Sequence, residues 1–217
     1  MSSNAASGLF RIEHDLLGER EIPADAYWGI HSLRARENFP ISGSTIGGQS
    51  DLVRALACVK LAAARANQDL GVLPAERAGV IVQACQEIIE GALHDQFIVD
   101  VIQGGAGTST NMNANEVIAN RALELLGAKK GHYDVLHPIQ DVNASQSTND
   151  VYPTALRIAM CFSLQRLLVA MAELRGAFEA KALEFDDVLK MGRTQLQDAV
   201  PMTLGQEFLT YAVMLGE

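Results

Sequence analysis

The chain has 217 residues, of which 48% are hydrophobic and 20% are charged, so its composition excludes an intrinsically disordered protein. Lys and Arg number 17 against 26 Asp and Glu, giving a formal net charge of −9. This acidic balance argues against a nucleic-acid partner, because phosphate contacts require clustered Lys and Arg.

The composition of the N-terminus and the spacing of the cysteines favour a cytoplasmic protein. Residues 1 to about 10 are small and polar, so we expect a frayed tail, and residues 1–8 have no secretory-signal pattern. Cys58, Cys85 and Cys161 lie far apart without metal-ligand spacing, so they are expected to be core residues in a reducing compartment. Polar residues interrupt the best membrane candidate, 155–171, so no membrane span or membrane partner is expected.

Local signals predict irregular structure near the N-terminus and helices after it. The predicted elements, in chain order, are a turn and short strand at 18–23, a strand-like segment at 27–30, a loop at 42–48, and helices at 50–70, 74–91 and 111–126. Ser50 or Asp51 is the expected cap of the first helix, and Gly71 and Gly127 fit the positions just after helix ends.

A fourth helix is predicted from Pro153 to about Asp186. At 1.5 Å per residue, about 35 residues would span roughly 50 Å. Few polar residues occur between Ile158 and Met171, so most sides of this helix require burial. We therefore expect a long-helix bundle that more chain or other subunits complete, the alternative being an ordinary amphipathic surface helix.

The first of three polar clusters is the glycine-rich stretch 104–115. Its glycines allow close approach of the backbone to a ligand, and the hydroxyls of Thr108, Ser109 and Thr110 are donors at a helix start. These features are typical of an anion site. The alternative is a capping loop whose polar side chains are satisfied locally.

The second cluster, residues 143–150, directly precedes the fourth helix. Ser147, Thr148, Asn149 and Asp150 are all good N-cap residues, although a helix needs only one. The partial positive charge at a helix start favours a bound carboxylate, to which uncharged hydroxyls and amides donate hydrogen bonds.

The third cluster is residues 192–202, a predicted loop before a last helix that starts near Pro201. In the functional interpretation, Thr194 and Gln195 face the same ligand as the other clusters. The structural alternative is a loop held by an Arg193–Asp198 ion pair. Uncharged donors at several helix ends suit a small dianion, and the five histidines form no metal-ligand pattern, so no metal site is predicted.

The three clusters carry a family resemblance. Residues 105–121, 145–150 and 192–201 closely resemble the aspartase/fumarase superfamily, and residues 13–25 with 37–40 are similar to its aspartase branch. The resemblance extends from about residue 11 to residue 217. It implies an all-α fold with a small mixed N-terminal domain, 1–148, and the start of a helical bundle, 149–217, that is completed in a homotetramer with active sites shared between subunits.

The resemblance also implies an activity: reversible elimination of ammonia from L-aspartate to fumarate through an aci-carboxylate intermediate. The implied substrate-binding residues are Thr108, Ser147, Thr148, Asn149, Thr194 and Gln195. No cofactor is implied to be required, and activation by divalent cations is a trait of some members.

Two departures from the family pattern bear on this interpretation. The catalytic serine loop, Gly-Ser-Ser-x-x-Pro-x-Lys-x-Asn, does not occur in the sequence. We therefore expect an N-terminal portion that is inactive alone, with the general-base serine beyond Glu217. Residues 137–141 resemble a secondary carboxylate site of fumarases but differ from it after the proline.

Two rival functions stay open. A class II fumarase usually carries His where Gln195 stands, and a neutral amide cannot shuttle protons as imidazole does. The other rival is a non-catalytic helical oligomerisation or binding protein.

Overall fold

The computed structural model describes residues 9–217. Residues 1–8 of the expected frayed tail lie outside the described part. The chain divides into two compact units, residues 1–160 and 161–217. The boundary predicted after residue 148 coincides with the start of a helix that continues across both units, so the domain division stays a prediction.

The N-terminal segment is more regular than expected. Strands β1 (Phe10–Asp15) and β2 (Gly18–Pro23) form an antiparallel hairpin. The strand predicted at 27–30 is wrong, because Gly29 is the N-cap of helix α1 (Ile30–Asn38). Two carboxylates from other elements accept the N–H groups at the start of α1. Glu13 accepts that of Ile30, and the distant Glu116 accepts those on either side of it, so the start of this helix depends on tertiary contacts.

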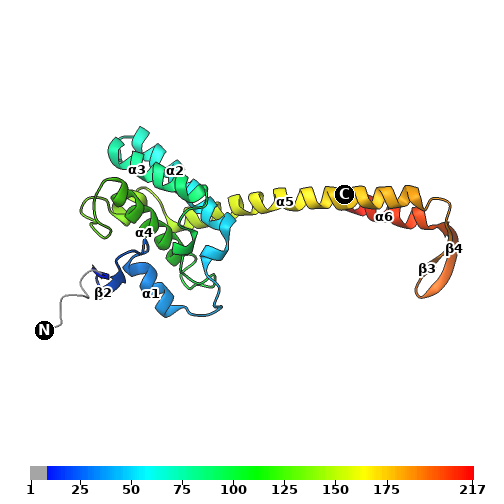
Figure 1. Cartoon of the computed structure of the whole chain (residues 1–217), viewed down its shortest axis with the longest axis horizontal. Helices are drawn as coiled ribbons and strands as arrows, with labels where there is room; N and C mark the ends of the chain where they lie inside the picture. Colours follow the sequence, from blue (N-terminus) through cyan, green and yellow to red (C-terminus); the bar gives the residue numbers. More distant parts are fainter. Residues whose placement is uncertain (1–8) are drawn as a thin grey trace. The chain divides into compact units, whose positions relative to one another are not determined.

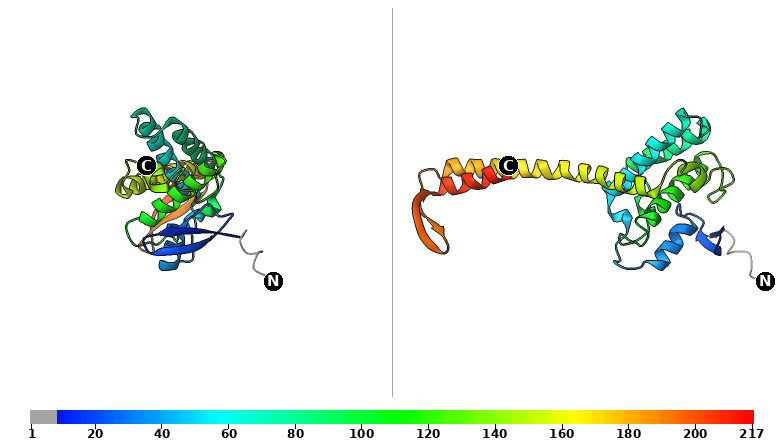
Figure 2. Two further views of the ribbon diagram at one scale, coloured as in Figure 1. Left: turned by 90° about the vertical axis from the view of Figure 1, so that its left-hand side faces the viewer. Right: turned by 180° about the vertical axis from the view of Figure 1, so that it is seen from behind.

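The three predicted helices that follow are confirmed as α2 (Ser50–Asp69), α3 (Ala75–Ile89) and α4 (Thr108–Leu125). Helices α2 and α3 run side by side (Figures 1 and 2). The predicted cap of α2 is wrong, because Gln49 occupies that position without a side-chain bond. Short turns of 3-10 or π helix connect these elements, namely η1 (Ile46–Gly48), η2 (His94–Gln96) and η3 (Pro138–Val142).

Helix α4 is the centre of the first unit. Its residues from Asn113 to Asn120 are all buried, and they include asparagines and a glutamate as well as apolar residues. Buried polar groups are stable only when they are hydrogen-bonded. The polar positions of α4 therefore connect it to α1, to η3 and to the start of the next helix.

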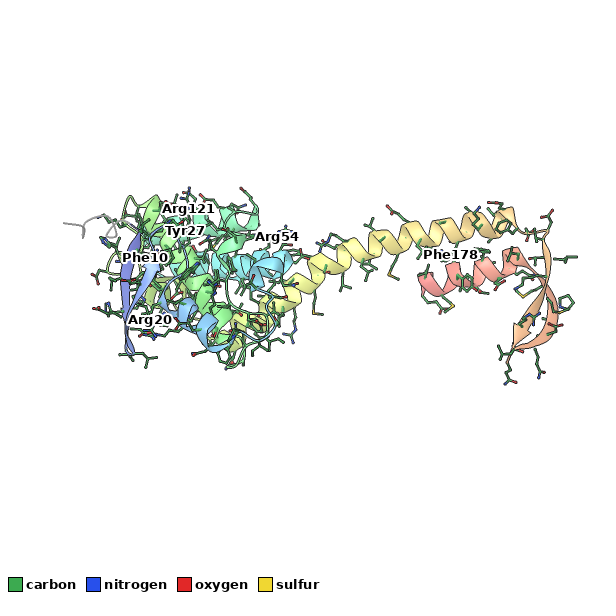
Figure 3. All side chains as sticks on the ribbon, turned by 60° about the horizontal axis from the view of Figure 1, so that its bottom comes forward. Phe10, Arg20, Tyr27, Arg54, Arg121 and Phe178 are labelled. Atoms are coloured by element: carbon green, nitrogen blue, oxygen red, sulfur yellow. The ribbon has the colours of Figure 1, made fainter. Side chains whose placement is uncertain are left out.

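The predicted fourth helix is confirmed as α5 (Thr148–Glu184), which begins before Pro153 and contains that proline in its first turns. The loop predicted at 192–202 is instead a hairpin of β3 (Leu189–Thr194) and β4 (Gln197–Thr203), followed by α6 (Leu204–Gly216). In the second unit, Phe178 of α5 lies against Phe208 and Tyr211 of α6 (Figure 3).

Much of α5 is exposed within this single chain. The large apolar residues exposed along it are Leu156, Met160, Leu164, Leu167, Leu168, Val169, Leu174 and Leu183. By length and composition alone α5 is apolar enough to cross a membrane, contrary to the sequence-based expectation. A core helix of a soluble assembly passes the same test. Cys161, predicted to be buried, is exposed on this helix, whereas Cys85 is buried.

Candidate active site

The first cluster forms a glycine-rich loop that leads into α4. Gly107 is the N-cap of α4 and has a φ of +87°, a conformation that glycine adopts without steric cost. Thr108 begins the helix and is exposed, and its Oγ1 donates to the carbonyl of Gly105 at 2.7 Å. The helix start predicted at residue 111 thus lies at Thr108.

The second cluster forms the start of α5. The backbone N–H of Asn149 donates to Oγ of Ser147 at 3.2 Å, so Ser147 supplies the capping contact. The Asn149 side chain is exposed, and the Thr148 hydroxyl accepts a hydrogen bond from Asn111 of α4 at 3.0 Å. The cluster therefore holds more hydrogen-bonding groups than capping requires, as the sequence predicted.

The two clusters meet within one chain. An open groove of about 390 Å³ is lined by Gln103, Ala106 and Gly107 from the first loop and by Asn149 and Tyr152 from α5. The contact is tight, because a Cβ on Gly107 would lie 2.4 Å from Cγ of Tyr152. The loop before α4 and the start of α5 thus border one groove within a single chain. Convergence of Thr108 with Ser147, Thr148 and Asn149 on one ligand, which was expected across protomers, stays a prediction.

The third cluster lies in the second unit. Thr194 ends β3, and Gln195 and Leu196 form the hairpin tip, with φ values of 52° and 65°. Thr194 and Gln195 are exposed. Arg193 and Asp198 form the expected ion pair at 3.4 Å, but both are mostly exposed, so the pair contributes little stability. Convergence of Thr194 and Gln195 with the other two clusters stays a prediction.

Residues 137–141 have structural roles that account for their polarity. The Nδ1 atom of His137 accepts the N–H groups of Ile139 and Gln140, and burial lowers the pKa of His137. Asp141 pairs with Arg77 at 2.8 Å and accepts the N–H of His137. These contacts close the π-helical turn η3 on itself, and a secondary carboxylate site there stays a prediction.

Two buried ionisable groups of the first unit were not identified from the sequence. Glu116 is fully buried and accepts hydrogen bonds from Gly29, His31 and Ser32 of the α1 segment. Lys60 of α2 is also fully buried and donates to Asn143 at 2.8 Å. The repeated asparagines of α4 were the one visible signal, since polar residues on a buried helix require partners.

The pairing of His31 with Glu116 predicts a pH-dependent stability. The hydrogen bond to Glu116 raises the pKa of His31 above its ordinary 6.5, against the opposing effect of burial, and the nearby Asp15 and Glu13 add to the rise. A raised folded-state pKa gives stability that is complete below 6.5 and is lost as pH rises through the folded value.

Urea denaturation measured at several pH values checks this, with fluorescence of Trp28, the sole tryptophan, as the signal. We expect the stability that His31 contributes, taken as the difference in free energy of unfolding between the unmodified chain and His31→Gln, to shrink as pH rises from 6 to 8. The lowered pKa values of Lys60 and His137 make stability rise with pH, and their effect cancels in this difference. A difference that stays constant over this range would contradict a contribution from His31.

Metal ligation has no support in the described residues, 9–217, where no group of three or more His, Cys, Asp or Glu side chains could hold an ion.

A family model described as a lyase matches residues 18–217. The chain belongs to this lyase family. Aspartate ammonia-lyase from Pseudomonas aeruginosa is 60% identical over 207 residues, which is 95% of this chain and 44% of that protein. Aspartate ammonia-lyase from Escherichia coli is 57% identical over 212 residues, again 44% of its length. The lyase chain thus spans less than half the length of the curated relatives it matches.

Solved structures of other lyases share the fold. A fumarate lyase:delta crystallin from Brucella melitensis, bound to cobalt, has a TM-score of 0.94 and 59% identity, covering 95% of this chain and 45% of that one. A class II fumarase from Schistosoma mansoni has a TM-score of 0.89 at 36% identity, covering 95% and 43%. The mainly helical fold predicted from the sequence, with its small sheet part, is confirmed.

Proposed function

We propose that a lyase built on this chain reversibly eliminates ammonia from L-aspartate to give fumarate. The observation that carries the proposal is the 60% identity, across 95% of the chain, to the aspartate ammonia-lyase of Pseudomonas aeruginosa. The class II fumarase of Schistosoma mansoni is only 36% identical. Gln195, at a position where fumarases usually carry histidine, supports the same choice.

The proposed reaction begins with removal of a proton from the carbon next to the β-carboxylate of L-aspartate. The electron pair moves into that carboxylate and forms an aci-carboxylate. When the pair returns, the carbon–nitrogen bond breaks, ammonia leaves and the double bond of fumarate forms. The sequence lacks the family's serine loop, so the base is supplied from outside these 217 residues.

The groups of this chain act on the carboxylates. Thr108, Ser147, Thr148 and Asn149 are uncharged and lie at the starts of α4 and α5, where the partial positive charge of each helix favours an anion. Donors placed for the developing negative charge stabilise the intermediate more than the substrate. Thr194 and Gln195 are also proposed to bind substrate, in a site that several copies of the chain form together.

Assembly is part of the proposal. The exposed apolar residues of α5, such as Leu164, Leu167 and Leu168, follow one another along one helix. Soluble monomers normally expose such side chains singly, so a run of them indicates an interaction surface. We propose that α5 helices of several copies cover one another in a cytoplasmic homotetramer that needs no resident cofactor. Sedimentation of the assembled enzyme in buffer without detergent tests this, and recovery only in detergent would instead favour a membrane location.

A fusion protein tests the activity. We define the fused lyase as this chain joined to the part of Pseudomonas aeruginosa aspartate ammonia-lyase beyond the 44% that it matches. The fused lyase is expected to release fumarate from L-aspartate, followed by ultraviolet absorbance, and to leave L-malate unchanged. The 217-residue chain alone is expected to be inactive, because it lacks the serine loop.

The outcomes separate the rival functions. Conversion of L-malate in preference to L-aspartate would indicate a class II fumarase. A folded, tetrameric fusion that converts neither substrate would indicate a binding or oligomerisation protein.

A further inference from the structure

Behind the α5 start lies a buried chain of hydrogen bonds that runs from Lys60 to Thr148. Nζ of Lys60 donates to Oδ1 of Asn143 at 2.8 Å. Nδ2 of Asn111 donates both to that same Oδ1 and to Oγ1 of Thr148, each at 3.0 Å. Lys60 and Asn111 are 0% and 2% exposed, so water does not compete for these bonds.

Lys60 has an unusual setting for a buried amine. Within residues 9–217 it forms no ion pair, and its neighbours are amide groups and the thiol of Cys85. Burial lowers the pKa of Lys60 to about 7. Near neutral pH part of Lys60 is therefore the neutral amine, so Lys60 alone does not fix the orientation of Asn143.

The donor and acceptor capacities of these groups set the direction of the whole chain. Nδ2 of Asn143 donates to the backbone carbonyl of Gln146 at 3.0 Å, so Oδ1 of Asn143 is the atom that faces Lys60 and Asn111. Asn111 must then present its NH₂ group to that oxygen, and the second N–H of Asn111 is left for Thr148. The Thr148 oxygen is therefore an acceptor within the protein, and its own hydrogen is free to point outward.

We propose that Asn111, oriented by Asn143, is a positioning residue that makes the Thr148 hydroxyl a donor to a substrate carboxylate. The proposal deepens the proposed function and rests on it. Neither Asn111 nor Asn143 needs to touch the substrate. Their effect is to remove the alternative hydroxyl orientation, in which Thr148 would donate into the protein and present only lone pairs to an anion.

Asn111→Asp is the decisive change, because it keeps the side-chain shape but replaces the donor with an acceptor. The Thr148 hydrogen would then turn toward Asp at position 111 and be lost to the substrate. In the fused lyase we expect kcat/KM to fall about 10²-fold, similar to the effect of Thr148→Val. Asn38→Asp makes the same chemical change at an exposed asparagine at the end of α1 and should leave kcat/KM unchanged.

A double-mutant cycle separates positioning from general damage. If Asn111 acts through the Thr148 hydroxyl, Asn111→Asp should cost little further activity once Thr148→Val is present. An equal additional loss in that background would overturn the proposal, because charge repulsion or misfolding would act with or without the hydroxyl. Activity of the unmodified fused lyase reports on the proposed function separately.

A second measurement needs no activity. In the 217-residue chain, the side-chain amide protons of Asn111 should exchange with solvent far more slowly than those of exposed Asn38. Asn143→Ala, which removes the acceptor that holds the Asn111 amide, should speed that exchange. Rapid exchange at Asn111 in the unmodified chain would refute the buried orientation even if the fused lyase were inactive.

Discussion

Asn149→Ala in the fused lyase is expected to lower kcat by about 10²–10³-fold while changing the KM for L-aspartate little, as loss of one donor to a developing oxyanion does in other enzymes. The Asn149 side chain is exposed in the groove that the loop before α4 shares with the start of α5. Its own backbone N–H is already bonded to Ser147, so the helix does not need the amide side chain as a cap. The amide is therefore available to the aci-carboxylate.

Steady-state kinetics on L-aspartate measure the effect. Asn38→Ala, an exposed asparagine at the end of α1, is the matched control and should leave both constants unchanged. A raised KM with unchanged kcat would contradict the assignment, because it would mean that Asn149 binds substrate and intermediate equally well.

Glu116→Ala is expected to lower the free energy of unfolding of the first unit by about 3–5 kcal/mol, as removal of one partner from a buried charged network does. The carboxylate is fully buried and accepts the backbone N–H groups of Gly29, His31 and Ser32 at 2.8–3.1 Å, as well as the Ser32 hydroxyl. These donors would be left buried without partners, and each such group costs about 1–3 kcal/mol.

Urea denaturation followed by Trp28 fluorescence measures this loss close to the affected contacts, since Trp28 is adjacent to Gly29 in the sequence. Glu21→Ala, which removes an exposed glutamate from β2, should change stability by no more than about 0.5 kcal/mol. A loss below about 1 kcal/mol in Glu116→Ala would show that solvent replaces the carboxylate, contrary to its burial.

Local sequence signals were sufficient to predict helices α2, α3 and α4. Gly71 and Gly127 both follow helix ends with positive φ values of 70° and 73°, where glycine is favoured. Helix α1 was missed because its first turn is satisfied by Glu116, which is 84 positions or more away in the sequence. The β3–β4 hairpin was missed because its turn, Gln195-Leu196, lacks the glycine or asparagine typical of such turns.

The sequence by itself determined the lyase family, the mainly helical fold and the presence of uncharged donors at the helix starts, because these follow from motifs and periodic patterns in contiguous residues. Only the tertiary structure brought the loop before α4 against Tyr152 and joined Lys60 to Thr148 through two asparagines. The physical reason is that a hydrogen bond depends on the positions of two groups in space. When those groups come from distant parts of the chain, no local pattern records which of them donates and which accepts.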